Sequence, residues 1–369
     1  MIEWHDTLMT RHSGCLGAAL VAVVVSAAVA PTAFAEGDGS SKLSFHGSLT
    51  QAYARTDGET VLGIPERGTS DYRTVSLQFG YALGDNDRMV VQLAHERIGE
   101  SPGMAFRQDV ELDWAFFEHR FSDAFEVKAG RVQIPRGIFN EIRDIGTLLP
   151  FYRPPSAFYS ETVSASETVD GVVVSSHLRR DQAWSIDADL YCGGWNSLES
   201  GRTGLVRTRV ENALGVHAWL QTPLEGLRVG GGVHRMTTRS QATATTQPQI
   251  NAGQYNVAAE GVFGPVVLRA EHAYSHSPGI VFRANYAQGG IKVWRGVVAN
   301  AEVQNAELEL SSGRLLGTFG LIRDFGVGLN YEFRPTLILK LEAHHNEGSG
   351  IGTPSPKARY GMASVAVSF

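Results

Sequence analysis

Hydrophobic and polar residues alternate with a period of two along most of the chain after residue 42. Near the start Leu43 and Phe45 alternate with polar neighbours, and near the end Val327 and Leu329 alternate with glycines. Side chains of a β-strand point alternately to its two faces, so this pattern predicts strands with one apolar face. Sixteen strands are expected, at residues 43–54, 72–83, 88–97, 109–121, 125–132, 168–178, 183–192, 211–221, 227–238, 253–263, 266–276, 283–294, 297–309, 323–333, 336–346 and 358–369.

The connections between these strands alternate in length. Short turns such as Gly264-Pro265 and Arg334-Pro335 alternate with longer connections. The longer ones are expected at residues 55–71, 98–108, 133–167, 193–210, 239–252, 277–282, 310–322 and 347–357. Short turns at one end and long loops at the other are typical of transmembrane β-barrels of the outer membrane. An even number of strands then places both termini at the end with the short turns.

A soluble β-sandwich also alternates apolar and polar residues, and two features favour the barrel over it. Charged residues such as Asp113, Asp187 and Lys340 lie in the middle of strands, where they suit a water-filled interior. Aromatic residues lie toward strand ends, as the girdles at membrane interfaces require. These aromatic residues are Tyr53, Tyr81, Trp184, Tyr255, Tyr331, Phe333, Tyr360 and Phe369.

The N-terminus has the form of a secretory signal peptide. Arg11 precedes an uncharged stretch at residues 16–30, and Ala33-Phe34-Ala35 supplies the small residues of a cleavage site. We therefore expect residues 1–35 to be removed and residues 36–369 to form the barrel. With 43% hydrophobic and 19% charged residues, the chain is too polar for a bundle of membrane helices.

Charge and cysteine content narrow the possible functions. The net charge of −6 does not suit nucleic acid as a partner. Cys192 is the only cysteine after the predicted cleavage site, so an intramolecular disulfide is excluded. No cofactor and no metal are expected, because neither His95-Glu96 nor His344-His345 has the spacing of a metal site.

The connection at residues 133–167 is long, apolar and charged at once, which predicts a third loop that folds into the barrel and narrows it. Folded into the barrel after the fifth strand, it would put its guanidinium groups next to the water path. The expected constriction residues are Arg131, Arg136, Glu141, Arg143, Asp144 and Arg153.

The wall opposite this loop is expected to be acidic. Alternation places the following charged residues on the inner face: Glu111, Asp113, Glu126, Lys128, Asp187, Asp189, Arg228, Glu260, Arg269, Glu271, Glu302, Glu332, Lys340 and Glu342. Charges at a constriction bias which ions pass. A basic loop facing an acidic wall predicts a transverse field across the narrowest point.

The segments Gly130-Arg131, 137–141 and Arg143-Asp144 resemble the end of the fifth strand and the constriction loop of Gram-negative outer-membrane porins, including relatives of the phosphate-selective porins. The resemblance implies a homotrimeric, water-filled diffusion channel. The final Phe369 is similar to the terminal aromatic residue that the barrel assembly machinery reads in this superfamily. Only five lysines occur, at positions 42, 128, 292, 340 and 357, so phosphate specificity is not inferred from the resemblance.

These observations favour a passive porin in the cell outer membrane, in contact with its lipid and lipopolysaccharide. It would pass small hydrophilic solutes and ions with weak charge selectivity and catalyse no reaction. A substrate-specific channel for an anionic nutrient such as phosphate or a carboxylate is the main alternative. An outer-membrane enzyme and a structural barrel plugged by its loops also stay open.

Overall fold

The computed structural model describes residues 42–101, 104, 109–159, 167–179, 184–201, 204–240, 249–311, 316–348 and 357–369, so the expected signal peptide lies outside the described residues. Within them the chain is almost entirely β-structure. Its strands are β1 (Leu43–Thr56), β2 (Thr69–Ala82), β3 (Asp87–Ile98), β4 (Glu111–Ser122), β5 (Phe125–Gln133), β6 (Thr168–Arg179), β7 (Ser185–Gly201), β8 (Gly204–Gln221), β9 (Leu227–Ser240), β10 (Ile250–Phe263), β11 (Val266–Ser277), β12 (Ile280–Trp294), β13 (Val297–Leu310), β14 (Gly317–Arg334), β15 (Leu337–Glu347) and β16 (Lys357–Ser368).

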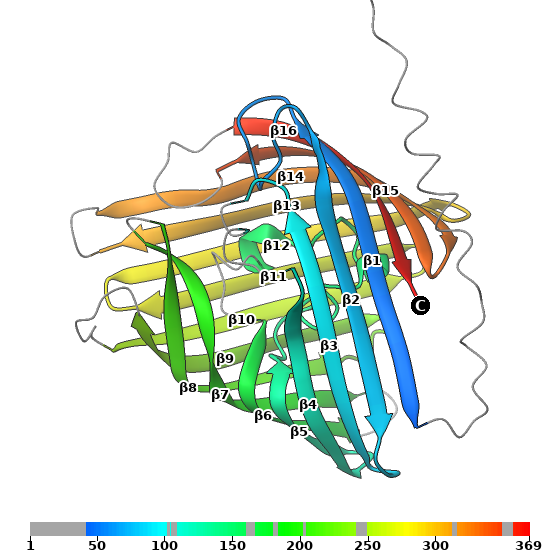
Figure 1. Cartoon of the computed structure of the whole chain (residues 1–369), viewed down its shortest axis with the longest axis vertical. Helices are drawn as coiled ribbons and strands as arrows, with labels where there is room; N and C mark the ends of the chain where they lie inside the picture. The colour runs from blue at the N-terminus through cyan, green and yellow to red at the C-terminus, as the bar shows by residue number, and fades with distance from the viewer. Residues whose placement is uncertain are drawn as a thin grey trace, which may run out of the picture. The chain divides into compact units, whose positions relative to one another are not determined.

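Each strand pairs antiparallel with its neighbours in sequence, and β16 pairs with β1 to close the barrel (Figure 1). Closure is required in lipid, which offers no hydrogen-bond partner to an open strand edge. At the seam, the Gly47 amide donates to the Phe369 carbonyl at 2.9 Å and the Phe369 amide donates to the Gly47 carbonyl at 3.0 Å. The Phe369 ring covers Gly47 so closely that any side chain at Gly47 would collide with it. The expected sixteen-stranded barrel is confirmed.

The two faces of the strands differ in chemistry as the alternation predicts. On β15, the outward-facing Leu341 is 60% exposed, whereas its neighbours Lys340 and Glu342 point inward and are buried. On β13, Val303 faces outward and Gln304 inward in the same way. An apolar belt around the outside and polar residues inside are the arrangement of a membrane-spanning barrel.

Two connections expected to be long loops are instead built from strand. β7 and β8 continue as a paired hairpin up to Gly201 and Gly204, so most of the expected loop at residues 193–210 is sheet. β11 and β12 are joined by the tight turn Pro278-Gly279, where residues 277–282 were expected to form a loop. Backbone pairing continues through these segments although their hydropathy no longer alternates. The glycines at 193 and 194 mark a β-bulge, which shifts the register there.

A second bulge reverses the expected orientation of β4. Gln92 and Leu93 on β3 pair with Trp114 and Leu112, which leaves Asp113 as the extra residue. After the bulge the even-numbered residues of β4 point inward, and Trp114 is only 5% exposed. Because alternation assigned Asp113 to the inner face, it implied that Trp114 faces outward, and one inserted residue makes that implication wrong.

Most of the expected girdle residues are exposed on the outer face, including Tyr53, Tyr81, Tyr255 and Phe333. Tyr360 was expected there as well, and this expectation is wrong. It is 7% exposed, points into the barrel and stacks on His344 with ring centroids 4.5 Å apart.

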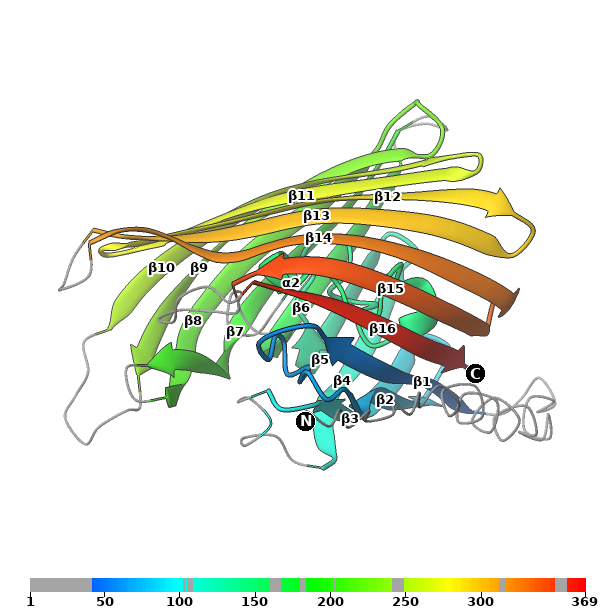
Figure 2. The same ribbon diagram turned by 90° about the horizontal axis from the view of Figure 1, so that it is seen from above.

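Two short helical segments, η2 (Gly146–Leu148) and α2 (Ser156–Tyr159), lie in the third loop. Figure 2 shows α2 surrounded by the strands of the barrel. Among the described residues, no helix is long and apolar enough to cross a membrane.

The orientation of Leu341 gives a test of the membrane belt. Leu341→Arg should lower the free energy of unfolding from lipid vesicles by about 2–4 kcal/mol, because the guanidinium of the folded barrel would face hydrocarbon. Leu224→Arg, in the turn between β8 and β9, serves as the control because Leu224 is exposed outside the strands. Urea titration of both variants measures the difference, and equal losses would contradict the assigned belt.

Candidate functional site

The third loop lies in the interior of the barrel, and its two helical segments contact neighbouring parts of the wall. The segment η2 contacts β16 and β1, while α2 contacts β12, β13 and β14. The expectation that this loop folds inward therefore holds for its described residues, 134–159 and 167.

Apolar side chains attach the loop to one side of the wall. Phe139, Phe158 and Tyr159 are almost fully buried and belong to one hydrophobic cluster with Ala284 and Tyr286 of β12. Small inward residues on the wall leave room for these rings, and burial of such large side chains is a strong stabilising contribution. This packing accounts for the unusual apolar content of the loop.

Glu271 of β11 provides a polar anchor for the first half of the loop. Its carboxylate accepts hydrogen bonds from the Ile138 amide at 3.1 Å, from the Tyr159 hydroxyl, and from the Tyr286 hydroxyl at 2.5 Å. Only 4% of Glu271 is exposed. Glu271 was expected to be a pore-wall charge facing water, but its carboxylate is occupied by the loop.

The second half of the loop is held through its backbone by polar side chains from β13 to β15. Lys340 Nζ donates to the Leu149 carbonyl at 2.7 Å and to the Phe151 carbonyl at 2.8 Å. Asn330 Nδ2 donates to the Pro150 carbonyl at 2.9 Å, and Gln304 Oε1 accepts from the Ala157 amide at 2.8 Å. Backbone carbonyl and amide groups of a loop inside a barrel need hydrogen-bond partners, and the side chains of the wall supply them.

The loop arginines face the wall rather than open water. Arg136 is 2% exposed and lies over the Phe158 ring at 5.9 Å, and Arg153 lies over the Tyr72 ring at 5.1 Å. Burial lowers the pKa of both guanidinium groups. Arg143 pairs with Glu167 at 2.8 Å and donates to the Tyr159 carbonyl at 3.1 Å. The expected basic constriction is therefore not formed by these three residues.

Arg131, also expected at the constriction, lies on the outer face. Its neighbour Val132 is 3% exposed and points inward, so Arg131 points outward, where it forms an ion pair with Asp170 at 2.7 Å. Alternation alone would have shown this, because Lys128 was assigned to the inner face and Arg131 has the opposite parity.

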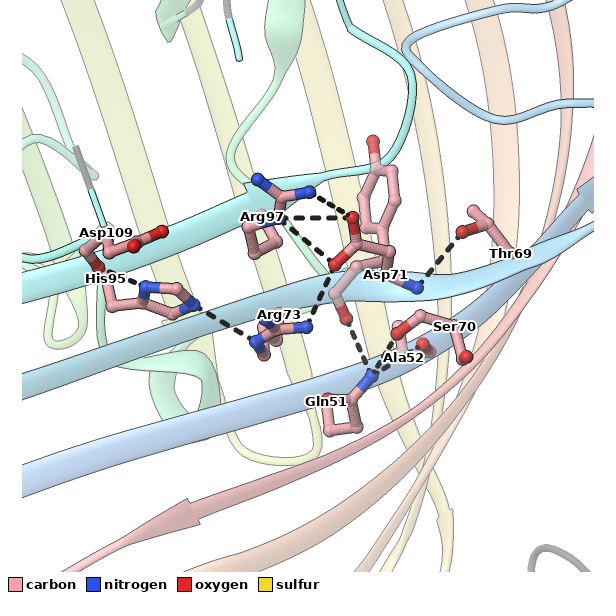
Figure 3. Close-up of polar contacts among 10 residues, drawn as sticks. Gln51, Ala52, Thr69, Ser70, Asp71, Arg73, His95, Arg97 and Asp109 are labelled. Carbon is pink, nitrogen blue, oxygen red and sulfur yellow. Dashed lines mark hydrogen bonds and ion pairs between the residues drawn. The ribbon is translucent and has the colours of Figure 1, made fainter. Parts of the chain in front are cut away.

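A further polar cluster lies on the outer face at the long-loop ends of β1 to β3 (Figure 3). Tyr72 is fully buried inside the barrel, so the flanking Asp71 and Arg73 point outward. Asp71 accepts hydrogen bonds from Arg97 at 2.5 and 3.1 Å and from Arg73 at 3.0 Å, while Arg73 also donates to His95 at 3.1 Å. The sequence analysis did not single out these residues.

The water-facing edge of the loop is acidic. Glu141 is exposed, and Asp144 accepts a hydrogen bond from Gln92 at 3.3 Å. Gln92 also donates to Asp113 at 3.0 Å, so the wall adds a carboxylate at the same place. Burial, followed by the charges of Asp113 and Glu167, raises the pKa of Asp144 well above its usual range.

The predicted wall charges lie on the inner face, and most of them are paired. Glu260 bridges Arg228 at 2.6 Å and Arg269 at 2.7 Å. Lys128 contacts Glu126 at 2.9 Å and Glu118 at 3.9 Å. A further pair joins His177 to Asp187 at 3.0 Å, while Glu111, Asp189 and Glu332 are half-buried on the same face.

Two of the predicted wall carboxylates are covered by the loop. Glu302 and Glu342 are 3% and 7% exposed, in a buried polar network with Asp324 and His344. Gln304 Nε2 donates to Glu302 at 2.7 Å, and His344 Nδ1 bonds Asp324 at 2.8 Å. These groups stabilise the contact between loop and wall and do not face the water path.

No protein-family model matches the sequence, and no curated protein matches it. The fold is similar to that of OmpF of Salmonella typhi in complex with daunomycin, with a TM-score of 0.59, 10% identity, and coverage of 89% of this chain and 97% of that chain. The outer membrane channel DcaP of Acinetobacter baumannii has a TM-score of 0.58 and 10% identity over the same shares of the two chains. OmpT, an outer membrane protein of Vibrio cholerae, has a TM-score of 0.57, again with 10% identity and the same coverage.

These similarities identify the fold as that of an outer-membrane β-barrel, in agreement with the apolar belt. They extend to outer-membrane barrels generally and give no particular support to the phosphate-selective porins. The expected architecture and membrane are therefore confirmed at the level of the barrel class.

The role of Lys340 as a loop anchor can be tested with a matched lysine. Lys340→Met should lower stability by about 1.5–3 kcal/mol, because two carbonyl groups lose a charged donor. It should also make the loop more accessible to added protease and the ion current noisier. Lys128→Met removes the same charge from the inner face without touching the loop. Equal behaviour of the two variants would show that Lys340 does not anchor the loop.

Proposed function

We propose that this protein is a passive channel for small hydrophilic solutes and ions across the outer membrane. One observation supports the proposal above all: the third loop is hydrogen-bonded chiefly to β11–β16, while inward-facing charged side chains of β5, β7 and β9 keep contact with water. Arg228, for example, has 32% of its side chain exposed. A plug would be expected to cover both sides of the interior.

Diffusion through such a channel needs no chemical step. Ions entering it stay hydrated and interact with charged side chains that are already paired, so no single site holds them strongly. The loop limits the size of the solute, because its backbone is held at many points and cannot move aside without breaking hydrogen bonds. The absence of catalysis stays a prediction.

The charges that face water favour a weak preference for cations. Arg136 is buried and Arg153 is half-buried over the Tyr72 ring, whereas Glu141 is exposed and Asp144 half-buried at the edge of the loop. This is the reverse of the basic loop and acidic wall expected from sequence. A field of this polarity attracts cations to the acidic edge of the loop.

The double variant Glu141→Gln with Asp144→Asn tests this assignment in planar bilayers under a salt gradient. The reversal potential should shift toward anions, because two negative charges leave the water path. Asp170→Asn, an exposed carboxylate on the outer face, serves as the control. If the double variant and the control give the same reversal potential, the loop edge does not set selectivity.

Lowering the pH should shift the selectivity of the wild-type channel toward anions, as the double variant should. Because the pKa of Asp144 is raised, its carboxylate takes up a proton at a higher pH than an ordinary aspartate. Cation preference should therefore decline as the pH is lowered, beginning at a higher pH than an ordinary aspartate would cause, and it should decline less in Asp144→Asn. An identical pH profile for both proteins would contradict this.

The proposal includes partners on the outer face and at the terminus. We propose a homotrimer that contacts lipopolysaccharide and outer-membrane lipid, with Phe369 as the residue read by the barrel assembly machinery. One similar solved structure is a trimer form of OmpT of Vibrio cholerae. Phe369 is 59% exposed at the β1–β16 seam, where a partner can reach it.

A channel specific for an anionic nutrient is the second candidate. The cluster of Arg228, Glu260 and Arg269 favours it, because two guanidinium groups share one carboxylate and leave local positive charge on the inner wall. Guanidinium groups suit carboxylate and phosphate ligands. Current blocked by one anion at low concentration would favour this candidate over general diffusion.

A further inference from the structure

A recess of about 180 Å³ lies between the third loop and the wall formed by β11 to β15. Val267, Val298 and Ile338 line it, and each is the second residue of a strand that leaves a short turn. The recess is therefore on the short-turn side of the loop. Asn300 and Asn330, which also line it, are inward-facing residues of the wall, so the recess faces the interior of the barrel.

Most of the recess is apolar. Leu148 and Leu149 of the loop form one side, and the aliphatic side chains of the wall strands form the other. Leu148 is 50% exposed although it lies in the interior of the barrel. A cavity of about 150 Å³ in another protein accepts benzene, so this recess can hold an aromatic ring or a short branched chain.

Arg269 places positive charge at one end of the recess. It donates to Glu260 through Nε at 2.7 Å, and Glu260 is already paired with Arg228. Glu260 is thus shared by two guanidinium groups, and the half-buried Glu332 adds a second carboxylate to the lining of the recess. Arg228 lies apart from the recess, over the Trp219 ring at 4.3 Å.

Two amide side chains add polar groups beside Arg269. Gln288 pairs directly with Arg269 across the strands, and Asn300 lies on the next strand, β13. They are 6% and 8% exposed, and Asn300 Nδ2 and Gln288 Oε1 have no hydrogen-bond partner among the described residues. An unpaired buried donor is costly, so the Asn300 amide is a ready second donor for a ligand oxygen.

We propose that this recess binds a small organic monocarboxylate with an apolar body, the carboxylate on Arg269 and Asn300 and the body against Leu148 and the wall. The inference rests on the proposed channel function and names a class of solute for it. A carboxylate suits a guanidinium better than a neutral group does, and an apolar body distinguishes the solute from inorganic anions.

The test uses the full barrel and benzoate as the probe, with benzyl alcohol and acetate as the neutral and body-free comparisons. Binding is measured by isothermal titration in detergent, and block of the ion current is measured in planar bilayers. Arg269→Gln should weaken benzoate binding at least tenfold. Arg228→Gln also removes one guanidinium partner of Glu260, but this partner lies outside the recess. It should change benzoate binding less than threefold.

Leu148→Asp provides a second variant on the loop side, where the exposed side chain can change without a cost in folding. It should weaken benzoate binding about as much as Arg269→Gln, because a carboxylate would face a carboxylate. Equal losses in Arg269→Gln and Arg228→Gln, or equal binding of acetate and benzoate, would overturn the proposal. A barrel that conducts without binding benzoate refutes the recess alone, whereas one that binds benzoate without conducting refutes the channel alone.

Discussion

Backbone hydrogen bonding determines this structure at two levels. In lipid, the peptide groups of a strand can pair only with another strand, which forces β16 onto β1 and closes the barrel. Closure creates an interior, and the third loop that fills part of it meets the same requirement, because its peptide groups are also buried. Side chains of the wall satisfy them: Lys340 and Asn330 bond to carbonyl groups, and Glu271 and Gln304 bond to amides.

The hydrogen bonding of the loop backbone by wall side chains divides the inner wall into two regions. The strands from β11 to β16 use their polar residues to hold the loop, so charges such as Glu342 are buried there. The strands from β4 to β9 offer fewer polar groups to the loop, among them His217, which accepts from the Gly137 amide at 3.4 Å. Most of their charges pair with one another while keeping contact with water, as Lys128 does with Glu126. The loop arginines follow the same logic, since Arg136 and Arg153 lie over aromatic rings and Arg143 pairs within the loop.

The recess at Arg269 lies where these two regions meet. Its apolar part comes from the loop anchoring, and its charge comes from the paired wall residues around Glu260. A channel built this way combines general diffusion of hydrated ions with one place of stronger affinity. That combination relates the two candidate functions to one another, because the same lumen can serve both.

The strands could be predicted from sequence because the alternation of hydropathy is local, with each residue oriented by its own backbone. The bulge at Asp113 was beyond that method, since Trp114 is acceptable on either face of a strand and only pairing with Gln92 fixes its direction. The role of Lys340 was out of reach for another reason. Its inward direction follows from alternation, but its partners lie about 190 residues away, and only the folded loop brings their carbonyl groups to it.

The central claim is that an anchored loop narrows an otherwise open barrel, and single-channel conductance of a loop-deleted barrel tests it most directly. Residues 138–159 would be replaced by a short glycine-serine linker and the current compared with that of the wild type in the same salt. The account predicts stepwise currents from both proteins and a several-fold larger conductance for the deletion. Equal conductance, or no current from a folded wild-type barrel, would contradict it.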